Sequence, residues 1–417
     1  MVIAYRNLIT NLKNNMSHLL ETYSLQTGAK ISKPFIIKNF YPVPEKYITI
    51  HNSSGMGAKN YDYFQDVIDI IFEDLERLNI KIVQIGGKED IALDKCTHLE
   101  GATTYQQTAY IIQNSLLHIG NDSFPVHLAS ASNTPLISLY SVTTPEIAGP
   151  YFNKENAHCL SPEYGENKPS FNPNEIPKTV NTIKIEKIIE KIYQILKIEN
   201  SKKIETLYIG NKYNQKIIDF IPNTFISQNL MNAAQINMRV DLVSEDIDEN
   251  IIFRNLQLGK FQLYLNNKKK IININALNLL KENINSVIFD VSDEPTDLSY
   301  ITSLIKAGIR PIIYYRNDNL NYFNNLKIDL LDFNLQFIKQ ETDKKDANIL
   351  ENISKNITDN IFLKSNRAIL SSGKVYLSEA HLNQNESSFS KICELKNIKN
   401  LQSLEKDIEY LMIYKIS

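Results

Sequence analysis

The sequence has no tryptophan, only three cysteines among 417 residues, and no long uninterrupted apolar run. Cys96, Cys159 and Cys393 are too far apart to form a metal-ligand motif, so we expect no metal ion. They favour a reducing setting, and we expect a cytoplasmic protein. No N-terminal stretch resembles a signal peptide, and none is apolar enough to span a bilayer, so we expect no transmembrane segment.

The sequence also has no excess of charge of either sign, because its 45 Lys and Arg residues nearly balance its 47 Asp and Glu residues. This balance argues against a strongly basic nucleic-acid-binding protein, although a local basic groove stays possible. Hydrophobic residues make up 43% of the chain, which excludes general disorder. A chain of this length can bury two separate cores.

The pattern predicts an α/β fold with two Rossmann-like, doubly wound domains. Residues 1–44 form an N-terminal helical segment and linker, in which leucines recur at helical spacing before the Pro-punctuated stretch "SKPFIIKNFYPVPEK". Residues 45–200 alternate short apolar strands such as "YITIH", "IKIVQIGG" and "PLISLY" with amphipathic helices. Strands separated by helices of this length predict a parallel sheet with right-handed crossovers.

A second β/α series occupies residues 201–417. It begins with "IETLYIG" and "KIIDFIPN" and continues through "KFQLYLN", "SVIFDV", "LSYITSLIKAG" and "RPIIYYR". Its last segment, "NIKNLQSLEKDIEYLMIYKI", has the spacing expected of a C-terminal helix.

Three polar loops of residues 45–200 follow predicted strands, where open parallel sheets bind their ligands. They are "HNSSGMGAK", "GGKED" and "GNDS". In the last loop, Asp122 or Ser123 can cap the helix that begins at Phe124. The start of that helix presents free N–H groups and a partial positive charge, which suit a phosphate.

The stretch "HIGNDSFPVHLASASNTPLISLYSVTTPEIAGPY" resembles the donor-binding half of glycosyltransferase family nine, the ADP-heptose:lipopolysaccharide heptosyltransferases. The family pattern reads approximately N-D-S-G-P-x-H-x-A-A-A, then a strand, then G-P-T and G-P-Y. The upstream segments "IKIVQIGGKED" and "LEGATTYQQTAYIIQNS" agree, so the resemblance extends over about residues 15–195. It implies a GT-B fold and inverting, metal-independent transfer from a nucleoside-diphosphate sugar, with no further cofactor.

The resemblance also assigns the residues that hold the donor. Ser53, Ser54 and Lys59 correspond to residues that bind the diphosphate, although a solvated surface lysine is the simpler reading of Lys59. Glu89 or Asp90 corresponds to the ribose ligand, whereas an exposed turn is the simpler reading for both.

Further positions complete the implied donor site. Thr103 corresponds to a position near the nucleobase, Asp122 would face the donor sugar, and Ser123 would bind phosphate. His127 would orient the loop from the helix behind it, and a partly buried histidine with satisfied hydrogen bonds is the simpler reading. Phe124 replaces the glycine that lets the family backbone approach the pyrophosphate, which puts that contact or the donor's identity in question.

The domain order departs from the family, because no acceptor domain precedes the donor region. We therefore expect a circularly permuted or rearranged protein in which residues 201–417 bind the acceptor. Asp293 and Glu294, in the loop "FDVSDEPTD", are our candidates for the general base, with turn and N-cap roles as the alternative.

Several functions remain open at this stage. The acceptor of a glycosyltransferase would be a surface glycan, or a hydroxymethylated DNA base if the protein is viral. The alternatives are a non-catalytic protein that binds a nucleotide or nucleotide-sugar, and a nucleotide-sugar epimerase.

Overall fold

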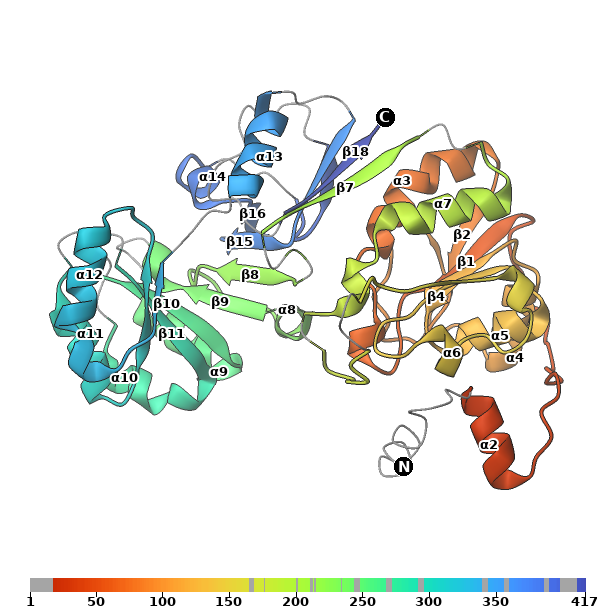
Figure 1. The fold of residues 1–417 in the computed structure, drawn as a ribbon, viewed down its shortest axis with the longest axis horizontal. Coiled ribbons are helices and arrows are strands. Elements are labelled where there is room, and N and C mark those ends of the chain that lie inside the picture. Colours follow the sequence, from red (N-terminus) through yellow and green to blue (C-terminus); the bar gives the residue numbers. More distant parts are fainter. Residues whose placement is uncertain are drawn as a thin grey trace. The chain divides into compact units, whose positions relative to one another are not determined.

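The structure is a computed structural model of the chain. It describes residues 18–164, 169–175, 177–199, 202–210, 213, 215–233, 235–243, 248–267, 272–291, 296–339, 344–355, 360–385, 390–397 and 411–417. The chain divides into two compact units (Figure 1). Unit 1 consists of residues 1–206 with Ser417, and unit 2 of residues 207–416.

Unit 1 contains a six-stranded parallel sheet in the order β3-β2-β1-β4-β5-β6. The strands are β1 (Tyr47–His51), β2 (Lys81–Gln84), β3 (Thr97–His98), β4 (His118–Asn121), β5 (Leu136–Leu139) and β6 (Ala157–Leu160). The winding starts at β1, proceeds outward to β3, and then resumes at β4 on the other side of β1. This is the strand order of a doubly wound nucleotide-binding fold, and its direction reverses between β1 and β4.

Helices cover both faces of the unit 1 sheet. The helices of unit 1 are α2 (Leu19–Thr27), α3 (Phe64–Arg77), α4 (Tyr105–Gln113), α5 (Phe124–Ser132), α6 (Pro145–Ala148) and α7 (Ile185–Leu196), with short 3₁₀ turns at Gly57–Lys59, Lys154–Asn156 and Thr179–Thr182. Helices α4 and α5 pack on one face of the strands, and Figure 1 shows α3 and α7 on the other. Buried Asp74 joins α3 to α7, because it accepts a hydrogen bond of 2.6 Å from the Tyr193 hydroxyl.

Unit 2 contains an eight-stranded sheet in the order β13-β12-β11-β10-β9-β8-β15-β16. Its strands are β8 (Ile217–Phe220), β9 (Gln235–Arg239), β10 (Phe261–Asn266), β11 (Ile284–Asp290), β12 (Pro311–Tyr315), β13 (Phe337–Lys339), β15 (Arg367–Ser371) and β16 (Lys374–Tyr376). All neighbouring strands are parallel except β15 and β16. From β8 to β13 the strands follow chain order, and the direction reverses only when β15 joins β8.

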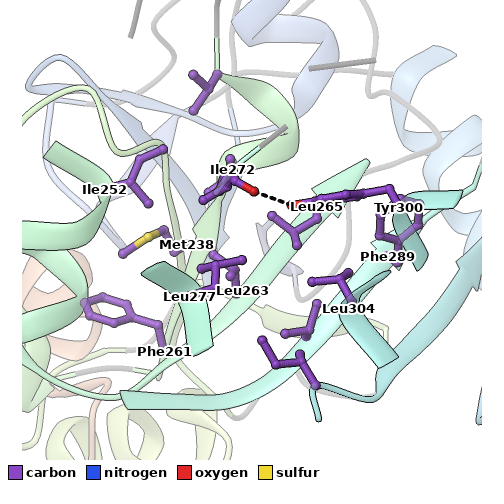
Figure 2. Packing of buried hydrophobic residues seen from close by; sticks show 14 of the residues in the cluster. Met238, Ile252, Phe261, Leu263, Leu265, Ile272, Leu277, Phe289, Tyr300 and Leu304 are labelled. Carbon is purple, nitrogen blue, oxygen red and sulfur yellow. Dashed lines mark hydrogen bonds between the residues drawn. The ribbon is translucent and has the colours of Figure 1, made fainter. Parts of the chain in front are cut away.

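The helices of unit 2 are α8 (Gln228–Ala233), α9 (Glu249–Leu258), α10 (Ile274–Leu279), α11 (Leu298–Lys306), α12 (Leu320–Asp329), α13 (Lys344–Lys355) and α14 (Glu379–Asn383), with 3₁₀ turns at Val240–Leu242, Lys281–Asn283 and Leu331–Phe333. Figure 2 shows the core that α9, α10 and α11 build with the strands, in which Ile252, Leu277 and Leu304 meet Met238 and Leu263. Across the described residues of both units, no helix has the length and apolar character needed to cross a membrane.

A four-stranded sheet corrects our expectation for the end of the chain. Its strands lie in the order β17-β14-β18-β7, formed by Leu395–Asn397, Ile361–Ser365, Leu411–Ile416 and Ile204–Ile209. The predicted C-terminal helix is wrong over Leu411–Ile416, which is a strand; residues 398–410 lie outside the described part of the chain. A short apolar run fits a buried strand as well as a buried helix, and Ile413 is fully buried between two neighbouring strands.

Candidate functional site

The candidate site lies where the winding of the unit 1 sheet reverses, at the carboxyl ends of β1 and β4. Open α/β sheets bind ligands at this point because the loops that follow the two strands diverge and leave a crevice. His51 ends β1, and the segment from Asn121 to Ser123 follows β4. Parallel pairing sets His51 opposite Gly120, so the two loops start beside each other.

The start of helix α5 provides open hydrogen-bond donors. Ser123 is the N-cap residue with extended backbone angles, but its hydroxyl does not cap the helix. It donates instead to the Asn121 carbonyl over 3.1 Å. Within the described part of the chain, the N–H groups of Ser123 and Phe124 have no hydrogen-bond acceptor. A helix start of this kind combines free N–H groups with a partial positive charge, which favours an anion.

Lys59 reaches this helix start from the loop after β1. Its Nζ lies 2.5 Å from Oδ2 of Asp122, and the Thr143 hydroxyl donates to the same oxygen over 2.7 Å. Asp122 is 5% exposed and Lys59 14% exposed at the side chain, so the pair is shielded from water. The structure therefore brings together two predicted site residues, Lys59 and Asp122, as each other's ion-pair partners.

His51 and Asp90 form a second series of contacts, which ends at Ser123. His51 Nδ1 lies 3.0 Å from the Ser123 hydroxyl, and His51 Nε2 lies 3.5 Å from Oδ2 of Asp90. Asp90 also accepts the Gly87 N–H over 2.8 Å. Burial would raise the pKa of Asp90, but hydrogen bonds from His51, Ser53 and the Gly87 N–H outweigh it and lower the pKa. Asp90 is thus an ionised residue that holds the β1, β2 and β4 loops together.

The other predicted donor ligands lie in the loops after β1, β2 and β3. The Ser54 hydroxyl donates to the Met56 carbonyl over 2.8 Å, which stabilises the turn before Lys59. Glu89 is exposed, and its side chain has no hydrogen bond or ion pair within the described residues. Thr103 pairs with the Thr108 hydroxyl at 2.9 Å, just before helix α4. Among the predicted donor ligands of these loops, Ser53 contacts Asp90 directly, through a hydrogen bond to its carboxylate.

Phe124 and His127 are both exposed on helix α5. The Phe124 ring is 50% exposed and meets the ring of Tyr105, itself 75% exposed, edge to face at 5.4 Å. Exposed aromatic rings in contact form an apolar surface beside the helix start. The His127 ring makes no hydrogen bond to any described residue, but it lies close enough to feel the charges of Asp122 and Lys59. Burial, the largest effect, lowers the pKa of His127, and the Asp122 carboxylate opposes it.

Sequence reasoning missed His51 and Thr143, which contact the predicted residues directly. His51 was visible as the polar end of an apolar strand, and that position alone places it at the carboxyl edge of the sheet. The predicted general bases Asp293 and Glu294 lie outside the described residues. Among the residues that the structure does describe, no group of three or more His, Cys, Asp or Glu side chains could hold a metal ion.

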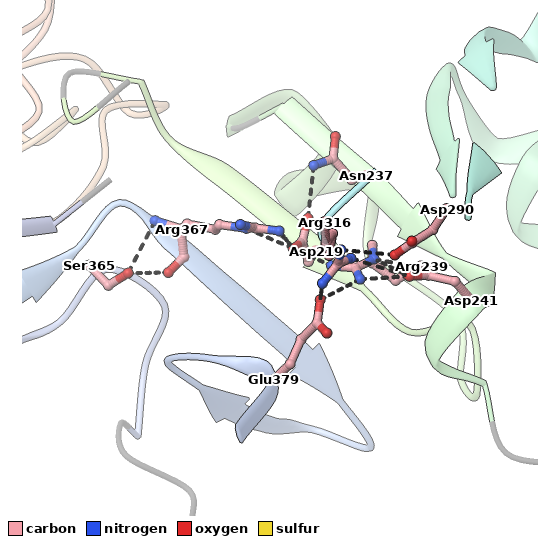
Figure 3. A network of polar contacts seen from close by, with 9 residues as sticks. All are labelled: Asp219, Asn237, Arg239, Asp241, Asp290, Arg316, Ser365, Arg367 and Glu379. Atoms are coloured by element: carbon pink, nitrogen blue, oxygen red, sulfur yellow. Dashed lines mark hydrogen bonds and ion pairs between the residues drawn. The ribbon is translucent and has the colours of Figure 1, made fainter. Parts of the chain in front are cut away.

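Sequence reasoning also missed a charged network in unit 2. Fully buried Arg239 contacts three carboxylates, with distances of 3.0 Å to Asp219, 2.6 Å to Asp241 and 2.6 Å to Glu379 (Figure 3). Arg316 joins the network at 2.8 Å from Glu379. These residues lie far apart in the sequence, and no local spacing marks them as a cluster.

Known proteins resemble unit 1 in sequence. The family model of glycosyltransferase family 9 (heptosyltransferase) matches residues 5–177. Lipopolysaccharide heptosyltransferase 3 of Escherichia coli is 42% identical over 115 residues, which cover 24% of this chain and 33% of that protein. Lipooligosaccharide heptosyltransferase 2 of Haemophilus influenzae is 37% identical over 59 residues, which cover 14% of this chain and 17% of that protein. The chain thus spans a third or less of the length of these two relatives.

Solved structures show a weaker likeness. The glycosyl transferase family 9 protein from Veillonella parvula is 19% identical to this chain, with a TM-score of 0.30. The matched region covers 42% of this chain and 50% of that protein. ADP-heptose lps heptosyltransferase II of E. coli is 18% identical to this chain, also with a TM-score of 0.30. The matched region covers 43% of this chain and 52% of that protein. Scores of this size carry no argument about architecture, and the sequence match alone supports the assignment. Residues 5–177 of this chain are thus similar in sequence to glycosyltransferase family 9.

Proposed function

We propose that this chain is a glycosyltransferase that binds a nucleoside-diphosphate sugar in unit 1 and transfers the sugar to an acceptor hydroxyl. One observation carries the proposal. The open start of helix α5 lies beside the Lys59–Asp122 ion pair, at the reversal point of a doubly wound sheet. Donors and a cation that converge on one crevice are suited to a diphosphate.

The geometry suggests how the leaving group is stabilised. Negative charge develops on the diphosphate as the sugar departs, and fixed donors aimed at that charge lower the barrier. The N–H groups of Ser123 and Phe124 supply such donors. Lys59 can turn from Asp122 toward a phosphate oxygen, or contact both at once, while Asp122 then faces the sugar. The exposed rings of Phe124 and Tyr105 offer an apolar surface to the nucleoside.

The finer features of the reaction follow from the family resemblance. We propose transfer with inversion and without a metal ion, in the cytoplasm, to a hydroxyl of a surface glycan. Unit 2 would bind the acceptor, in a permuted or rearranged domain order. Asp293 or Glu294 would accept the proton of the acceptor hydroxyl.

A thermal-shift panel of nucleoside diphosphates and their sugar conjugates tests donor binding. A ligand that binds only the folded protein stabilises it by about 2.7 kcal/mol at a concentration near 100 times its Kd, so the matching donor raises the Tm. We expect Lys59→Met to weaken this shift for every diphosphate. Lys187→Met is the matched control, because Lys187 pairs with the exposed Glu163 instead. If no nucleotide shifts the wild-type protein, the donor assignment fails.

A non-catalytic nucleotide-binding protein is the second candidate, favoured by the bulky Phe124 at the helix start. The two candidates differ in turnover. Release of the free nucleoside diphosphate from a bound donor, with or without an acceptor, supports the transferase. Donor binding without any sugar release, over the whole panel and with a mixture of acceptor glycans, supports the binding protein.

A further inference from the structure

The Ser123 hydroxyl lies between two partners at the candidate site of unit 1. Its oxygen is 3.0 Å from Nδ1 of His51 and 3.1 Å from the carbonyl oxygen of Asn121. A carbonyl oxygen can only accept a hydrogen bond, whereas a ring nitrogen of histidine donates or accepts according to its protonation. Because a serine hydroxyl has a single proton, the state of the His51 ring decides whether both contacts can be hydrogen bonds.

Asp90 defines the other edge of the His51 ring. Nε2 of His51 lies 3.5 Å from Oδ2 of Asp90, and only 10% and 14% of the two side chains are exposed. Burial would raise the pKa of Asp90, but the hydrogen bonds that the carboxylate accepts lower it overall. Asp90 is therefore ionised and can only accept a hydrogen bond. It follows that Nε2 of His51 carries a proton.

The two protonation states of His51 satisfy these contacts to different degrees. In the neutral ring, Nδ1 has no proton, so the Ser123 proton reaches either His51 or Asn121 and one contact stays unsatisfied. In the doubly protonated ring, Nδ1 donates to the Ser123 oxygen, and the Ser123 proton is directed to a second acceptor. A polar contact left unsatisfied away from water costs free energy. The doubly protonated ring is therefore the form that completes the series from Asp90 to Asn121.

The direction of the Ser123 proton matters because Ser123 is the N-cap residue of helix α5. Its N–H and that of Phe124 have no acceptor within the described residues, and an anion held by these groups lies beside the Ser123 hydroxyl. A phosphate oxygen carries negative charge and accepts more strongly than the Asn121 carbonyl. The Ser123 proton can therefore turn from Asn121 to a phosphate, provided that Nδ1 of His51 does not need it.

We propose that His51 is a positioning residue of the donor site, which in its doubly protonated form holds the Ser123 oxygen and leaves the Ser123 proton to the diphosphate. Binding of the donor then takes up a proton on His51. This inference rests on the proposed function, because its ligand is the same nucleoside-diphosphate sugar, and it adds a proton to the binding equilibrium. His51 acts through Ser123 and needs no contact with the donor itself.

The charged groups around His51 allow its ring to hold a second proton. Asp90 faces the ring from the loop after β2 and offsets its positive charge. Lys59 and Asp122, from the loops after β1 and β4, neutralise each other as an ion pair. On β4, burial and the charge of His51 lower the pKa of His118 to about 3, so His118 stays neutral and does not compete for the proton.

Calorimetric titration of the full-length protein tests this inference. The probes are the glucose conjugates of ADP, UDP, GDP, CDP and dTDP, whose diphosphates are esterified at both ends and do not ionise near neutral pH. Titrations in buffers of different ionisation enthalpy measure the protons taken up, at several values from about pH 6 to 9. We expect uptake that approaches about one proton per donor bound, and an affinity that falls by up to about tenfold per pH unit at the alkaline end.

Two variants assign the proton to His51. His51→Gln keeps an N–H donor for Ser123 but takes up no proton, so its affinity for the donor should stay constant over the same pH range. Ser123→Ala removes a single oxygen and should also abolish the uptake, which keeps the test open if His51→Gln fails to fold. His98→Gln is the matched control, because His98 pairs with Glu100 at the end of β3. It should take up as many protons as the wild-type protein.

The outcomes separate this inference from the proposed function. Uptake that persists in His51→Gln would assign the proton to His127 on α5, which the charges of Asp122 and Lys59 affect, and would overturn the inference. It is overturned as well if the wild-type protein binds a probe without proton uptake at every pH. The proposed function stands in both cases. If none of the probes binds, the proposed function fails and this inference fails with it.

Discussion

Asp90 shows how one carboxylate acquires a different role from the one its position in the sequence suggested. The acid after β2 was expected to receive the ribose hydroxyls. In the structure, the Asp90 carboxylate accepts hydrogen bonds from the Gly87 N–H and the Ser53 side chain, and it pairs with the His51 ring. Its oxygens are therefore engaged within the protein. Exposed Glu89 therefore becomes the better candidate for the ribose, and Asp90 becomes a positioning residue.

Gly86 tests this role of Asp90. A Cβ atom placed on Gly86 would overlap Oδ2 of Asp90, and the φ of +157° is a backbone conformation that residues with a side chain rarely adopt. We expect Gly86→Ala to displace the Asp90 carboxylate, lower stability by about 1–3 kcal/mol and weaken nucleotide binding. Gly87→Ala is the matched control, because its new carbon would lie at an ordinary 3.7 Å from Asp90. Equal nucleotide affinity in the two variants, measured by calorimetry, would contradict the role given to Asp90.

The loop after β4 was predictable because each residue there has a local reason for its type. Pro125 fits the first helical turn, and the free N–H groups of the helix start follow from backbone geometry alone. His51 and Thr143 were not predictable in the same way. They reach Ser123 and Asp122 from other strands, and only the three-dimensional order of the sheet brings them together.

Strand β18 marks the limit of prediction at the scale of elements. The strands β1, β2, β4 and β5 and the helices α3, α4, α5 and α7 lie where alternation and helical spacing indicated them. The short elements β3, α6 and β6 were not predicted from the sequence. The apolar run at the chain's end fitted both element types. Its partners are β14 and β7, and pairing of segments this distant in sequence leaves no mark in local spacing.

Two isoleucines of β18 test the strand assignment. Ile413 is fully buried in the core of the four-stranded sheet, whereas Ile416 lies near its end and is half-buried. We expect Ile413→Ala to destabilise unit 2 by about 2–5 kcal/mol through loss of apolar contacts and the cavity left behind. Ile416→Ala should cost clearly less. Denaturant unfolding of both variants measures this, and equal losses would argue against a buried central strand.

Strand β8 carries a pH-dependent contribution to stability through Asp219. Burial would raise the pKa of Asp219, but Arg367 and Arg239 outweigh it and lower the pKa below its ordinary 3.8. A lowered pKa in the folded state means that the stabilisation is complete above the ordinary pKa. It is lost as the pH falls through the lowered value. We expect Asp219→Asn to reduce stability at neutral pH and to flatten the acid part of its pH dependence. Urea unfolding at several pH values measures this. The prediction is wrong if Asp219→Asn loses as much unfolding free energy at acid pH as the wild-type protein does.

At the scale of the whole molecule, the residues of the donor site all belong to unit 1. We therefore expect Lys59→Met to weaken nucleotide binding. Tyr208→Ala in unit 2, where Tyr208 stacks on Tyr213, should leave nucleotide binding at its wild-type level. Calorimetric titration of both folded variants with the same nucleoside diphosphate measures this, and an equal loss of affinity in the two variants would contradict the placement of the donor site in unit 1.

The central claim is that the start of helix α5 holds the diphosphate of the donor. Selective ¹⁵N labelling of the 17 phenylalanines reports on it directly, because the Phe124 N–H is one of the open donors at that start. The Phe124→Leu variant assigns its resonance, and the other phenylalanines serve as internal controls. Addition of a nucleoside diphosphate that raises the Tm should shift the Phe124 amide signal downfield more than any other. If the nucleotide binds and the Phe124 amide stays in place while a phenylalanine of unit 2 moves, the donor site lies elsewhere.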